Sequence, residues 1–234
     1  MSALLTILYN YKMVNQEVLS LLKSFYENLS DAYRAIVDTF LKYEGKCLIY
    51  GGLVRDYLAN NKKFGDLDII CPNLFNETSS QNNIILDSEF IKALNKNNIE
   101  LKKCERRSLY TFNHYKLRLH HKVSTNQYFS NSVVHLDIID EFTGTNDFLC
   151  NSLFVEITRD GDSVNSKLGW RAQPGFQIDE AIEHCKNKKA LCVNPDDYLL
   201  DCRSQSLLSK GYTVIFDNSK EEEKKRIKMK RCRD

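Results

Sequence analysis

Apolar residues recur at helical spacing within residues 14–43 of this 234-residue chain. Residues three or four positions apart lie on the same face of a helix, so each recurring set predicts one buried helix face. A polar interruption at residues 28–31 separates the sets and predicts a break between two helices. Ser30 and Asp31 both suit the cap of the second helix, because their side-chain oxygens can accept a hydrogen bond from its first turn. The two sets are Val18, Leu21, Leu22 and Phe25, followed by Ala35, Ile36, Phe40 and Leu41.

Shorter apolar segments farther along the chain predict strands. Residues 47–50 predict a strand that enters a Gly-Gly turn, and residues 53–59 predict the helix that leaves it. A strand over residues 66–71 precedes a polar loop, rich in Asn and Ser, over residues 73–86. Alternation of apolar and polar residues then predicts the strands of a meander. The remaining elements of this region are a helix over residues 88–96 and strands over residues 100–103, 108–113, 116–123 and 133–139.

The last third of the chain has a weaker pattern. Residues 147–153 predict a short helix and residues 154–158 one more strand. From residue 177 to 210 the pattern becomes helical, with Pro195 between two helices, because proline cannot continue a helix interior. Gly211 fits the position after a helix, where a left-handed backbone is needed. The sequence holds no internal repeat.

The composition is that of an ordinary globular protein, with 42% hydrophobic and 27% charged residues. No apolar run approaches the roughly 20 residues that cross a bilayer. The N-terminus has neither a basic lead-in nor a small-residue cleavage site for secretion. Eight cysteines occur without a C-x-x-C pair, which favours buried, reduced thiols. We therefore expect no membrane attachment and a reducing compartment, either cytoplasm or nucleus.

The net charge of +2 conceals an uneven distribution. Residues 224–233 hold seven basic residues and no acidic one, so the rest of the chain is acidic on balance. The main body therefore lacks the broad basic surface of a non-specific nucleic-acid binder. The charged blocks near the C-terminus are typical of an exposed or disordered tail, with RNA binding and nuclear targeting as alternative roles.

Candidate chemistry is concentrated in the segment IYGGLVRDYLANNKKFGDLDII, residues 49–70. Gly51 and Gly52 lie between a strand and a helix, and without a Cβ their N–H groups can approach a phosphate closely. An ordinary strand-to-helix turn is the alternative. Asp66 and Asp68 alternate with apolar residues, so on a strand both carboxylates project from one face. Two carboxylates this close repel each other unless a cation lies between them, and their hard oxygen ligands suit Mg²⁺.

A third carboxylate is available on a later strand, VVHLDIIDE. Strand parity places Asp137 on the face of His135 and Ile139, and Asp140 on the opposite face. Asp137 is therefore the preferred third metal ligand, with Asp140 as the alternative. Arg55 lies one helical turn after the Gly-Gly turn, where its guanidinium can pair with phosphate oxygens or form a salt bridge on a solvated helix face.

These residues resemble the head domain of the DNA polymerase β-like nucleotidyltransferase superfamily, within the branch of bacterial-type poly(A) polymerases and CCA-adding tRNA nucleotidyltransferases. That branch is marked by Gly-Gly-x-Val-Arg-Asp-x-Leu, which matches residues 51–58, and by Asp-x-Asp-Ile, which matches residues 66–69. A later Asp-Phe and Asn-x-Leu pattern matches residues 147–153. The resemblance covers residues 30–155 and continues more faintly to residue 212.

The resemblance implies an α+β fold, namely a polymerase β-like nucleotidyltransferase head with a mixed sheet flanked by helices and a small C-terminal helical appendage. It divides the chain into an N-terminal helical segment, the head domain, a loop with a neck-like helical segment, and a charged, basic tail. These four parts correspond to residues 1–30, 31–158, 159–215 and 216–234.

The implied activity is transfer of a nucleotide from an NTP, either ATP or CTP, to an acceptor hydroxyl, with an RNA 3′ end as the favoured acceptor. Two Mg²⁺ ions, or Mn²⁺ in their place, would bind to Asp66, Asp68 and Asp137. Asp147 also fits a helix N-cap, and Asn151 also fits a role in satisfying buried backbone groups. The implied nucleotide-binding residues are Gly51, Gly52, Arg55, Asp56, Asp147 and Asn151.

Departures from the family pattern leave alternatives open. Thr145 and Asn146 replace arginines that help to hold the nucleotide in the family. Only a weak Asp201 and Arg203 pair stands near the position of the Glu-Asp-x-x-Arg element that selects the nucleotide. We do not expect CCA addition, because the family's long helical body has no counterpart here. The alternatives are a catalytically inactive binding or regulatory module, a protein or small-molecule acceptor, and a partner chain that supplies acceptor binding.

Basic side chains cluster on the predicted strand at residues 116–123. Alternation places them on one face, which is either solvated or follows a phosphate backbone. Nearby histidines are expected at the surface, and no His or Cys spacing indicates zinc. The basic residues are Lys116, Arg118 and Lys122, and the histidines are His114, His120 and His121.

Overall fold

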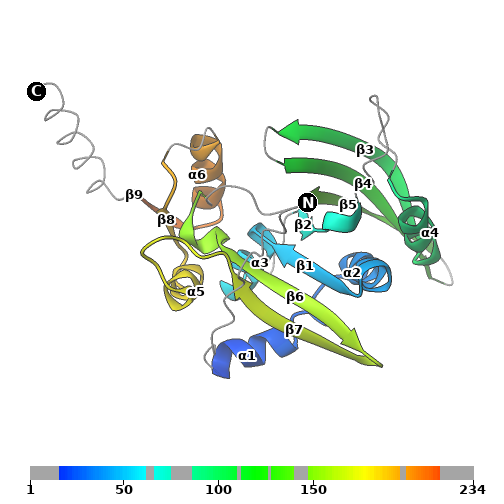
Figure 1. The fold of residues 1–234 in the computed structure, drawn as a ribbon, viewed down its shortest axis with the longest axis horizontal. Helices are drawn as coiled ribbons and strands as arrows, with labels where there is room; N and C mark the ends of the chain where they lie inside the picture. Colours follow the sequence, from blue (N-terminus) through cyan, green and yellow to red (C-terminus); the bar gives the residue numbers. More distant parts are fainter. Residues whose placement is uncertain are drawn as a thin grey trace, which may run out of the picture.

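The computed structural model describes residues 16–61, 66–74, 86–109, 112–125, 128–139, 147–195 and 199–216 of the chain (Figure 1). These residues form a seven-stranded mixed sheet flanked by helices, with a second, two-stranded sheet built from the C-terminal segment. The predicted α+β class, with a mixed sheet flanked by helices, is confirmed.

The large sheet has the strand order β3-β4-β5-β2-β1-β6-β7. β2 and β5 run parallel, whereas the other neighbouring strands run antiparallel. The parallel pair lies at the centre of the sheet and brings together two strands that are distant in the sequence. The strands are β1 (Lys46–Tyr50), β2 (Leu67–Ile70), β3 (Ile99–Leu109), β4 (Phe112–Thr125), β5 (Tyr128–Ile139), β6 (Leu153–Asp160) and β7 (Ser163–Trp170).

Capping residues set the ends of the second helix. α2 (Asp31–Glu44) begins after Ser30, whose side-chain oxygen accepts a hydrogen bond from the Tyr33 N–H, so Ser30 rather than Asp31 is the cap. Gly45 ends this helix with a left-handed backbone. The other helices beside the large sheet are α1 (Gln16–Lys23), α3 (Gly52–Leu58) and α4 (Ser88–Lys96).

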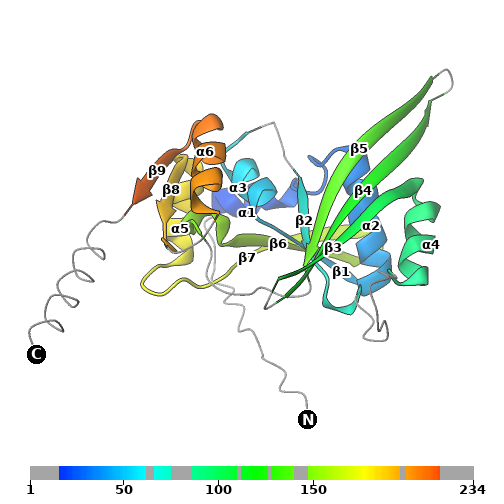
Figure 2. The same cartoon turned by 90° about the horizontal axis from the view of Figure 1, so that it is seen from above.

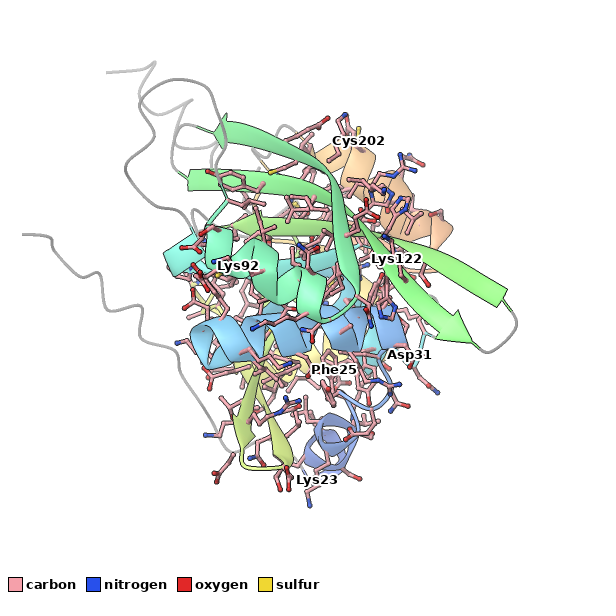
Figure 3. All side chains as sticks on the ribbon, turned by 90° about the vertical axis from the view of Figure 1, so that its right-hand side faces the viewer. Lys23, Phe25, Asp31, Lys92, Lys122 and Cys202 are labelled. Atoms are coloured by element: carbon pink, nitrogen blue, oxygen red, sulfur yellow. The ribbon has the colours of Figure 1, made fainter. Side chains whose placement is uncertain are left out.

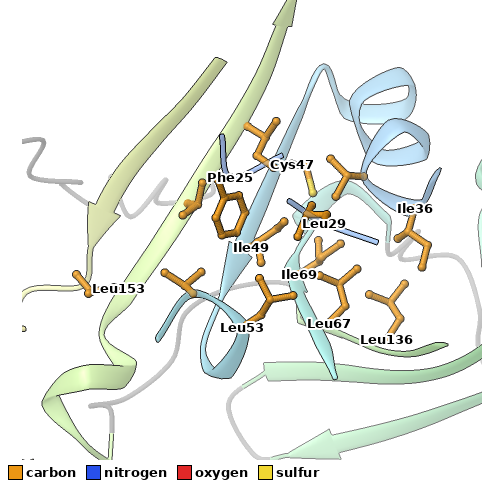
Figure 4. Packing of buried hydrophobic residues seen from close by; sticks show 14 of the residues in the cluster. Phe25, Leu29, Ile36, Cys47, Ile49, Leu53, Leu67, Ile69, Leu136 and Leu153 are labelled. Carbon is orange, nitrogen blue, oxygen red and sulfur yellow. The ribbon is translucent and has the colours of Figure 1, made fainter. Parts of the chain in front are cut away.

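The main hydrophobic core lies between the helices and one face of the large sheet. Figure 4 shows Ile36, Ile49, Ile69 and Leu136 in this core, and all four side chains are fully buried. Alternate residues of the same strands point to the opposite face. That opposite face has a smaller apolar cluster, formed by Leu48, Ile70, Ile139 and Phe154.

The C-terminal segment folds as two helices and two strands. α5 (Ile178–Lys186) and α6 (Leu200–Ser209) occupy the region predicted to be helical, and Gly211 follows α6 with a φ of 81°. β8 (Lys189–Cys192) and β9 (Thr213–Phe216) pair in parallel. The sequence pattern does not predict these two strands, because four residues give too little alternation to detect.

Other boundaries also differ from the sequence pattern. The predicted strand over residues 100–103 continues through polar residues into a long β3, because β4 pairs with it along its length. The predicted helix over residues 147–153 is a single 3₁₀ turn, Leu149–Asn151, and pairing of Leu153 with Trp170 draws the end of this segment into β6. The sheet continues past residue 158 through β7. The predictions for residues 1–15, 75–85 and 217–234 lie outside the described residues.

Within the described ranges, no helix combines the length and the apolar character that crossing a membrane requires. The cysteines in these ranges are free thiols, and most of them are buried. The buried ones are Cys47, Cys71, Cys150, Cys185 and Cys192.

Gly169 of β7 lies opposite Phe154 of β6, and the phenyl ring fills the space that a side chain would need. A Cβ added at Gly169 would lie 2.2 Å from Phe154 Cζ, and this ring is fully buried. We expect Gly169→Ala to lower the free energy of unfolding by about 1–3 kcal/mol in urea denaturation. Lys167→Ala, at an exposed site on the same strand, should cost less than about 0.5 kcal/mol. Equal effects of the two changes would contradict this packing.

Candidate active site

The Gly-Gly turn connects β1 to α3 and lies against an aspartate of the neighbouring strand. Gly51 has a φ of 74° and a ψ of −135°, a conformation essentially restricted to glycine. A Cβ on Gly51 would also lie only 2.8 Å from Asp68 Oδ2. The Gly52 N–H donates a hydrogen bond to the Asp68 carboxylate. Both the backbone and the neighbouring carboxylate therefore require glycine at position 51.

Asp68 and Asp137 are direct neighbours in the parallel pair of β2 and β5. Side chains paired in this way point to the same face of the sheet, here the face opposite the main core. Asp66 lies just before β2 and is exposed. Burial, and then the negative charges of Asp137 and Asp66, raise the pKa of Asp68 to about 7. Asp68 is thus within electrostatic reach of both other predicted acids.

Asp137 has two basic side chains beside it. Lys116 of β4 is its cross-strand neighbour, and Lys116 Nζ lies 3.2 Å from Asp137 Oδ2. His114 Nε2 lies 3.5 Å from the same oxygen. Burial acts to raise the pKa of Asp137, but the hydrogen bond from His114 and the charge of Lys116 outweigh burial and lower it. The paired acids are therefore unequal, because Asp137 is held ionised whereas Asp68 titrates near neutral pH.

Two further groups approach this acidic pair from other elements. Tyr50, the last residue of β1, is the cross-strand neighbour of Asp68. Burial, and then the charges of Asp68 and Asp137, raise the pKa of the Tyr50 hydroxyl well above its usual value, while Arg203 acts in the opposite direction. Arg203 belongs to α6, so the C-terminal segment brings a positive charge to the edge of the site.

Arg55 is buried in a network of side chains. Its Nε donates to Asp56 Oδ1 at 2.8 Å, and its Nη1 donates to Asn151 Oδ1 at 2.8 Å. The Arg55 guanidinium carbon lies 5.1 Å from the centre of the Tyr212 ring. Lys210 Nζ donates to Asp56 Oδ2 at 2.8 Å, and Asp56 is fully buried. Buried charged groups therefore tie α3 to the C-terminal segment.

Asp147 and Asn151 extend this network to α6. Asp147 Oδ1 accepts hydrogen bonds from the Phe148 N–H at 2.8 Å and from Asn151 Nδ2 at 3.0 Å. Arg203 Nη1 lies 2.9 Å from Asp147 Oδ2, with Asp147 buried and the Arg203 side chain 45% exposed. A continuous series of polar contacts therefore runs from Lys210 through α3 and the 3₁₀ turn to Arg203, and we call it the buried polar network.

The predicted site residues fall into two groups. The acidic pair and the Gly-Gly turn come together on one face of the sheet, with Asp66 beside them. The other predicted residues belong to the buried polar network, which adjoins the turn through α3. The first group is Gly51, Gly52, Asp68 and Asp137, and the second is Arg55, Asp56, Asp147 and Asn151.

Several residues near the site were missed by sequence reasoning. The alternation of basic residues on one strand was a signal for Lys116, but only the structure shows its register with Asp137. The predicted surface position of His114 and His121 is wrong, because His114 is half-buried beside Asp137 and His121 is buried. No sequence signal placed Tyr50 in the site. The alternative ligand Asp140 and the replaced arginine positions, Thr145 and Asn146, lie outside the described residues.

The acidic pair offers hard oxygen ligands, although it is not a complete metal cage. In the part of the chain that the structure describes, no three side chains of His, Cys, Asp or Glu are grouped so as to hold a metal ion. Mg²⁺ commonly uses one or two protein carboxylates together with waters and substrate phosphates. The pair of Asp68 and Asp137 therefore suits a cation that arrives with a phosphate-bearing ligand.

No protein-family model matches the sequence, and no curated protein matches it. Among solved structures, one described as a tRNA-processing enzyme (apo form I) is similar with a TM-score of 0.40 and 12% identity, over 88% of this chain and 46% of that chain. One described as a CCA-adding enzyme, apo form II, is similar with a TM-score of 0.40 and 13% identity, over 89% of this chain and 43% of that chain. The chain thus spans less than half the length of these two structures.

The buried polar network predicts a large cost for removing one charge. Asp56→Asn leaves Arg55 and Lys210 without their shared carboxylate, and a buried charge without its partner costs about 3–5 kcal/mol. We expect a loss of that size in the free energy of unfolding, measured by urea denaturation. The matched change Asp160→Asn, at an exposed site, should alter it by less than about 0.5 kcal/mol. A loss below about 1 kcal/mol for Asp56→Asn would show that the network carries little charge stabilisation.

Because the pKa of Asp68 is raised, we expect the stability of the protein to depend on pH in metal-free buffer. The pKa of Asp68 is raised in the folded state to about 7, so the stability associated with its protonated form is present at low pH and is lost as pH rises through 7. At about 1.4 kcal/mol per pKa unit over the two units from pH 5 to the pKa, the parent protein should lose about 3 kcal/mol relative to Asp68→Asn between pH 5 and pH 8. Urea denaturation at both pH values, in EDTA, measures this difference. Parallel pH profiles for the parent and Asp68→Asn would rule out the raised pKa.

Proposed function

We propose that this protein is a magnesium-dependent nucleotidyltransferase, which moves a nucleoside monophosphate from an NTP, either ATP or CTP, to the 3′ hydroxyl of an RNA. The observation that carries the proposal is the placement of the acidic pair directly beside a Gly-Gly turn. Asp68 is the register partner of Asp137 and lies so close to Gly51 that no other side chain fits there. This arrangement supports a phosphate site directly beside a site for its cation.

The chemistry of the donor set fits a hard divalent cation. Burial and two neighbouring carboxylates raise the pKa of Asp68 to about 7, so positive charge at this point would favour its ionised form. Asp68 and Asp137 would hold Mg²⁺, or Mn²⁺ in its place, and the exposed side chain of Asp66, which is not grouped with them in the structure, would join them to hold a second ion. When bound, such ions lower the pKa of the acceptor hydroxyl and neutralise charge on the leaving pyrophosphate.

The protein's own groups position the reactants. The turn at Gly51 and Gly52 lets the triphosphate approach the backbone, and Arg55 holds α3 in place through the buried polar network. Asp137 orients the acceptor hydroxyl and receives its proton. The acceptor oxygen forms a bond to the α-phosphorus, the bond between that phosphorus and the β-phosphate oxygen breaks, and pyrophosphate leaves.

A catalytically inactive, nucleotide-binding module is the second candidate, and one contact favours it. Lys116 Nζ lies 3.2 Å from Asp137 Oδ2 and already neutralises one carboxylate of the acidic pair. In such a module the lysine would take the place of a metal ion, and nucleotide binding would not depend on Mg²⁺. The requirement for a divalent cation therefore separates the two functions.

Thermal stability with ATP or CTP, in the presence and absence of Mg²⁺, tests this requirement. We expect the nucleotide and Mg²⁺ together to raise the melting temperature by several degrees, and the nucleotide alone to have little effect. Asp68→Asn combined with Asp137→Asn should abolish the shift, whereas Asp160→Asn, far from the acidic pair in sequence and exposed, should retain it. An equal shift without Mg²⁺ would favour the inactive module.

Incorporation of labelled NTPs into an RNA pool tests the transfer itself. The parent protein should label RNA 3′ ends, and the double aspartate variant should reduce labelling by about 100-fold or more, because both metal ligands are lost. Asp160→Asn should label RNA as the parent does. Metal-dependent nucleotide binding without labelling of RNA, but with labelling of a protein or a small molecule, would reassign the acceptor.

A further inference from the structure

We infer that the face of β4 and β5 that bears Asp137 binds the phosphate backbone of a single-stranded nucleic acid and leads its 3′ end to the acidic pair. We call these two strands the hairpin arm. The inference rests on the proposed function and adds to it the path of the acceptor. Three observations support the inference: the charge of the arm, the register of its strands and its position relative to Asp137.

The segment that builds the arm has an unusual distribution of charge. Residues 106–136 contain no aspartate or glutamate, although a chain with 31 acidic residues in 234 would place about four in a stretch of this length. The same segment holds four of the five histidines of the chain and five arginines and lysines, of which three lie on β4 and two at the end of β3. Apart from Asp137 at its base, the hairpin arm therefore carries no acidic side chain.

Strand alternation sorts these residues between the two faces of the sheet. One set points into the core and is buried, and the other set shares the face of Asp137. The exposed basic residues all belong to the second set, so they form a row rather than a scattered surface. The core-facing set includes Tyr115, Leu117, Leu119, Val134 and Leu136, and the row consists of Lys116, Arg118, His120, Lys122 and His135.

The row begins at the acidic pair and leads away from it. Lys116 lies opposite Asp137, Arg118 lies opposite His135, and Lys122 lies two steps farther along the same strand. Alternate residues on a strand are roughly 6–7 Å apart, comparable to the separation of successive phosphates in an extended single strand. A nucleic-acid strand can thus follow the row and place its end beside Asp137.

The outer part of the arm is open to a ligand. β3 pairs with β4 only as far as His121, so the residues of β4 beyond it pair with β5 alone. Figure 2 shows β4 and β5 extending beyond the rest of the sheet, and Figure 3 shows Lys122 on this arm. Val133, whose side chain is 45% exposed, lies opposite His120 and offers an apolar contact for a base.

Glu100 and Glu105 of β3 adjoin the row, each in an ion pair with a lysine, and do not prevent binding. Lys122 Nζ lies 2.8 Å from Glu100 Oε2, with the Lys122 side chain 57% exposed. Surface ion pairs of this kind contribute only about 0–1 kcal/mol, so a phosphate can compete for the lysine. Arg118 is exposed on the same face, and its guanidinium can pair with a phosphate through two hydrogen bonds.

The strand order assigns the row to the acceptor rather than to the NTP. The Gly-Gly turn follows β1, which lies on one side of β2, whereas β5 and β4 lie on the other side. A triphosphate at the turn and an acceptor on the arm would therefore approach the acidic pair from opposite sides. This is the geometry that an in-line displacement needs.

Fluorescence anisotropy with a labelled oligoadenylate tests the arm. We expect Arg118→Gln with Lys122→Gln to weaken binding at least fivefold at low salt, and to reduce the slope of log K against log salt by about 1.4, because single-stranded binding loses about 0.7 per phosphate contact. The matched control is Lys23→Gln with Lys92→Gln, two exposed lysines on α1 and α4 (Figure 3). The control should bind within twofold of the parent.

Other outcomes separate this inference from the proposed function. Equal affinity of the arm variant and the control variant for the oligoadenylate would overturn this inference, whether or not the protein transfers nucleotides. If the arm variant lost binding to phosphatidylserine vesicles but kept its RNA affinity, the inference would also be overturned, and the arm would instead be a membrane-binding surface. RNA binding that depends on the arm, without a Mg²⁺-dependent rise in melting temperature on addition of nucleotide, would support this inference and overturn the proposed transferase activity. Retention of that rise in the arm variant would show that the variant is folded.

Discussion

The parallel pairing of β2 with β5 is the constraint on which the candidate site depends. It fixes Asp68 beside Asp137 on one face of the sheet, and two carboxylates in that position disfavour each other's ionised form. Burial, and then the charge of Asp137, raise the pKa of Asp68, whereas His114 and Lys116 keep Asp137 ionised. A raised pKa in the folded state lowers stability above neutral pH. Under the proposed function, a cation bound at this pairing would offset that loss of stability.

The buried polar network explains how the C-terminal segment can influence a site on the large sheet. Arg55 lies in α3, directly after the Gly-Gly turn, and its partner Asp56 binds Lys210, which is distant in the sequence. Burying such charges adds little net stability, yet removing one partner is costly, so the contacts fix position more than they strengthen the fold. Arg203 at the other end of the network acts electrostatically on Tyr50, the cross-strand neighbour of Asp68. One set of contacts thus positions both the turn and α6.

Much of the fold can be predicted from local signals in the sequence, whereas contacts between residues that are distant in the sequence cannot. The cap at Ser30 and the helix over residues 88–96 follow from neighbouring residues alone, and the structure has both. Strand parity likewise placed Asp137 on the correct side of β5 relative to Asp68. The contact between Lys116 and Asp137 depends on hairpin register, which the pattern does not fix. The burial of Arg55 depends on Tyr212, 157 positions away, and no local pattern reports such a partner.

Lys116 belongs both to the surroundings of the acidic pair and to the basic row on the hairpin arm. Its ammonium group neutralises Asp137, and it is also the first member of the basic row on the hairpin arm. A divalent cation on the Asp137 carboxylate would displace the lysine, whose side chain is 39% exposed and can turn toward the acceptor phosphate at little cost. Binding of the cation would then release a positive charge for the acceptor, and binding of the acceptor would vacate the carboxylate for the cation. Each binding event would then favour the other, because a coupling between two binding events is reciprocal.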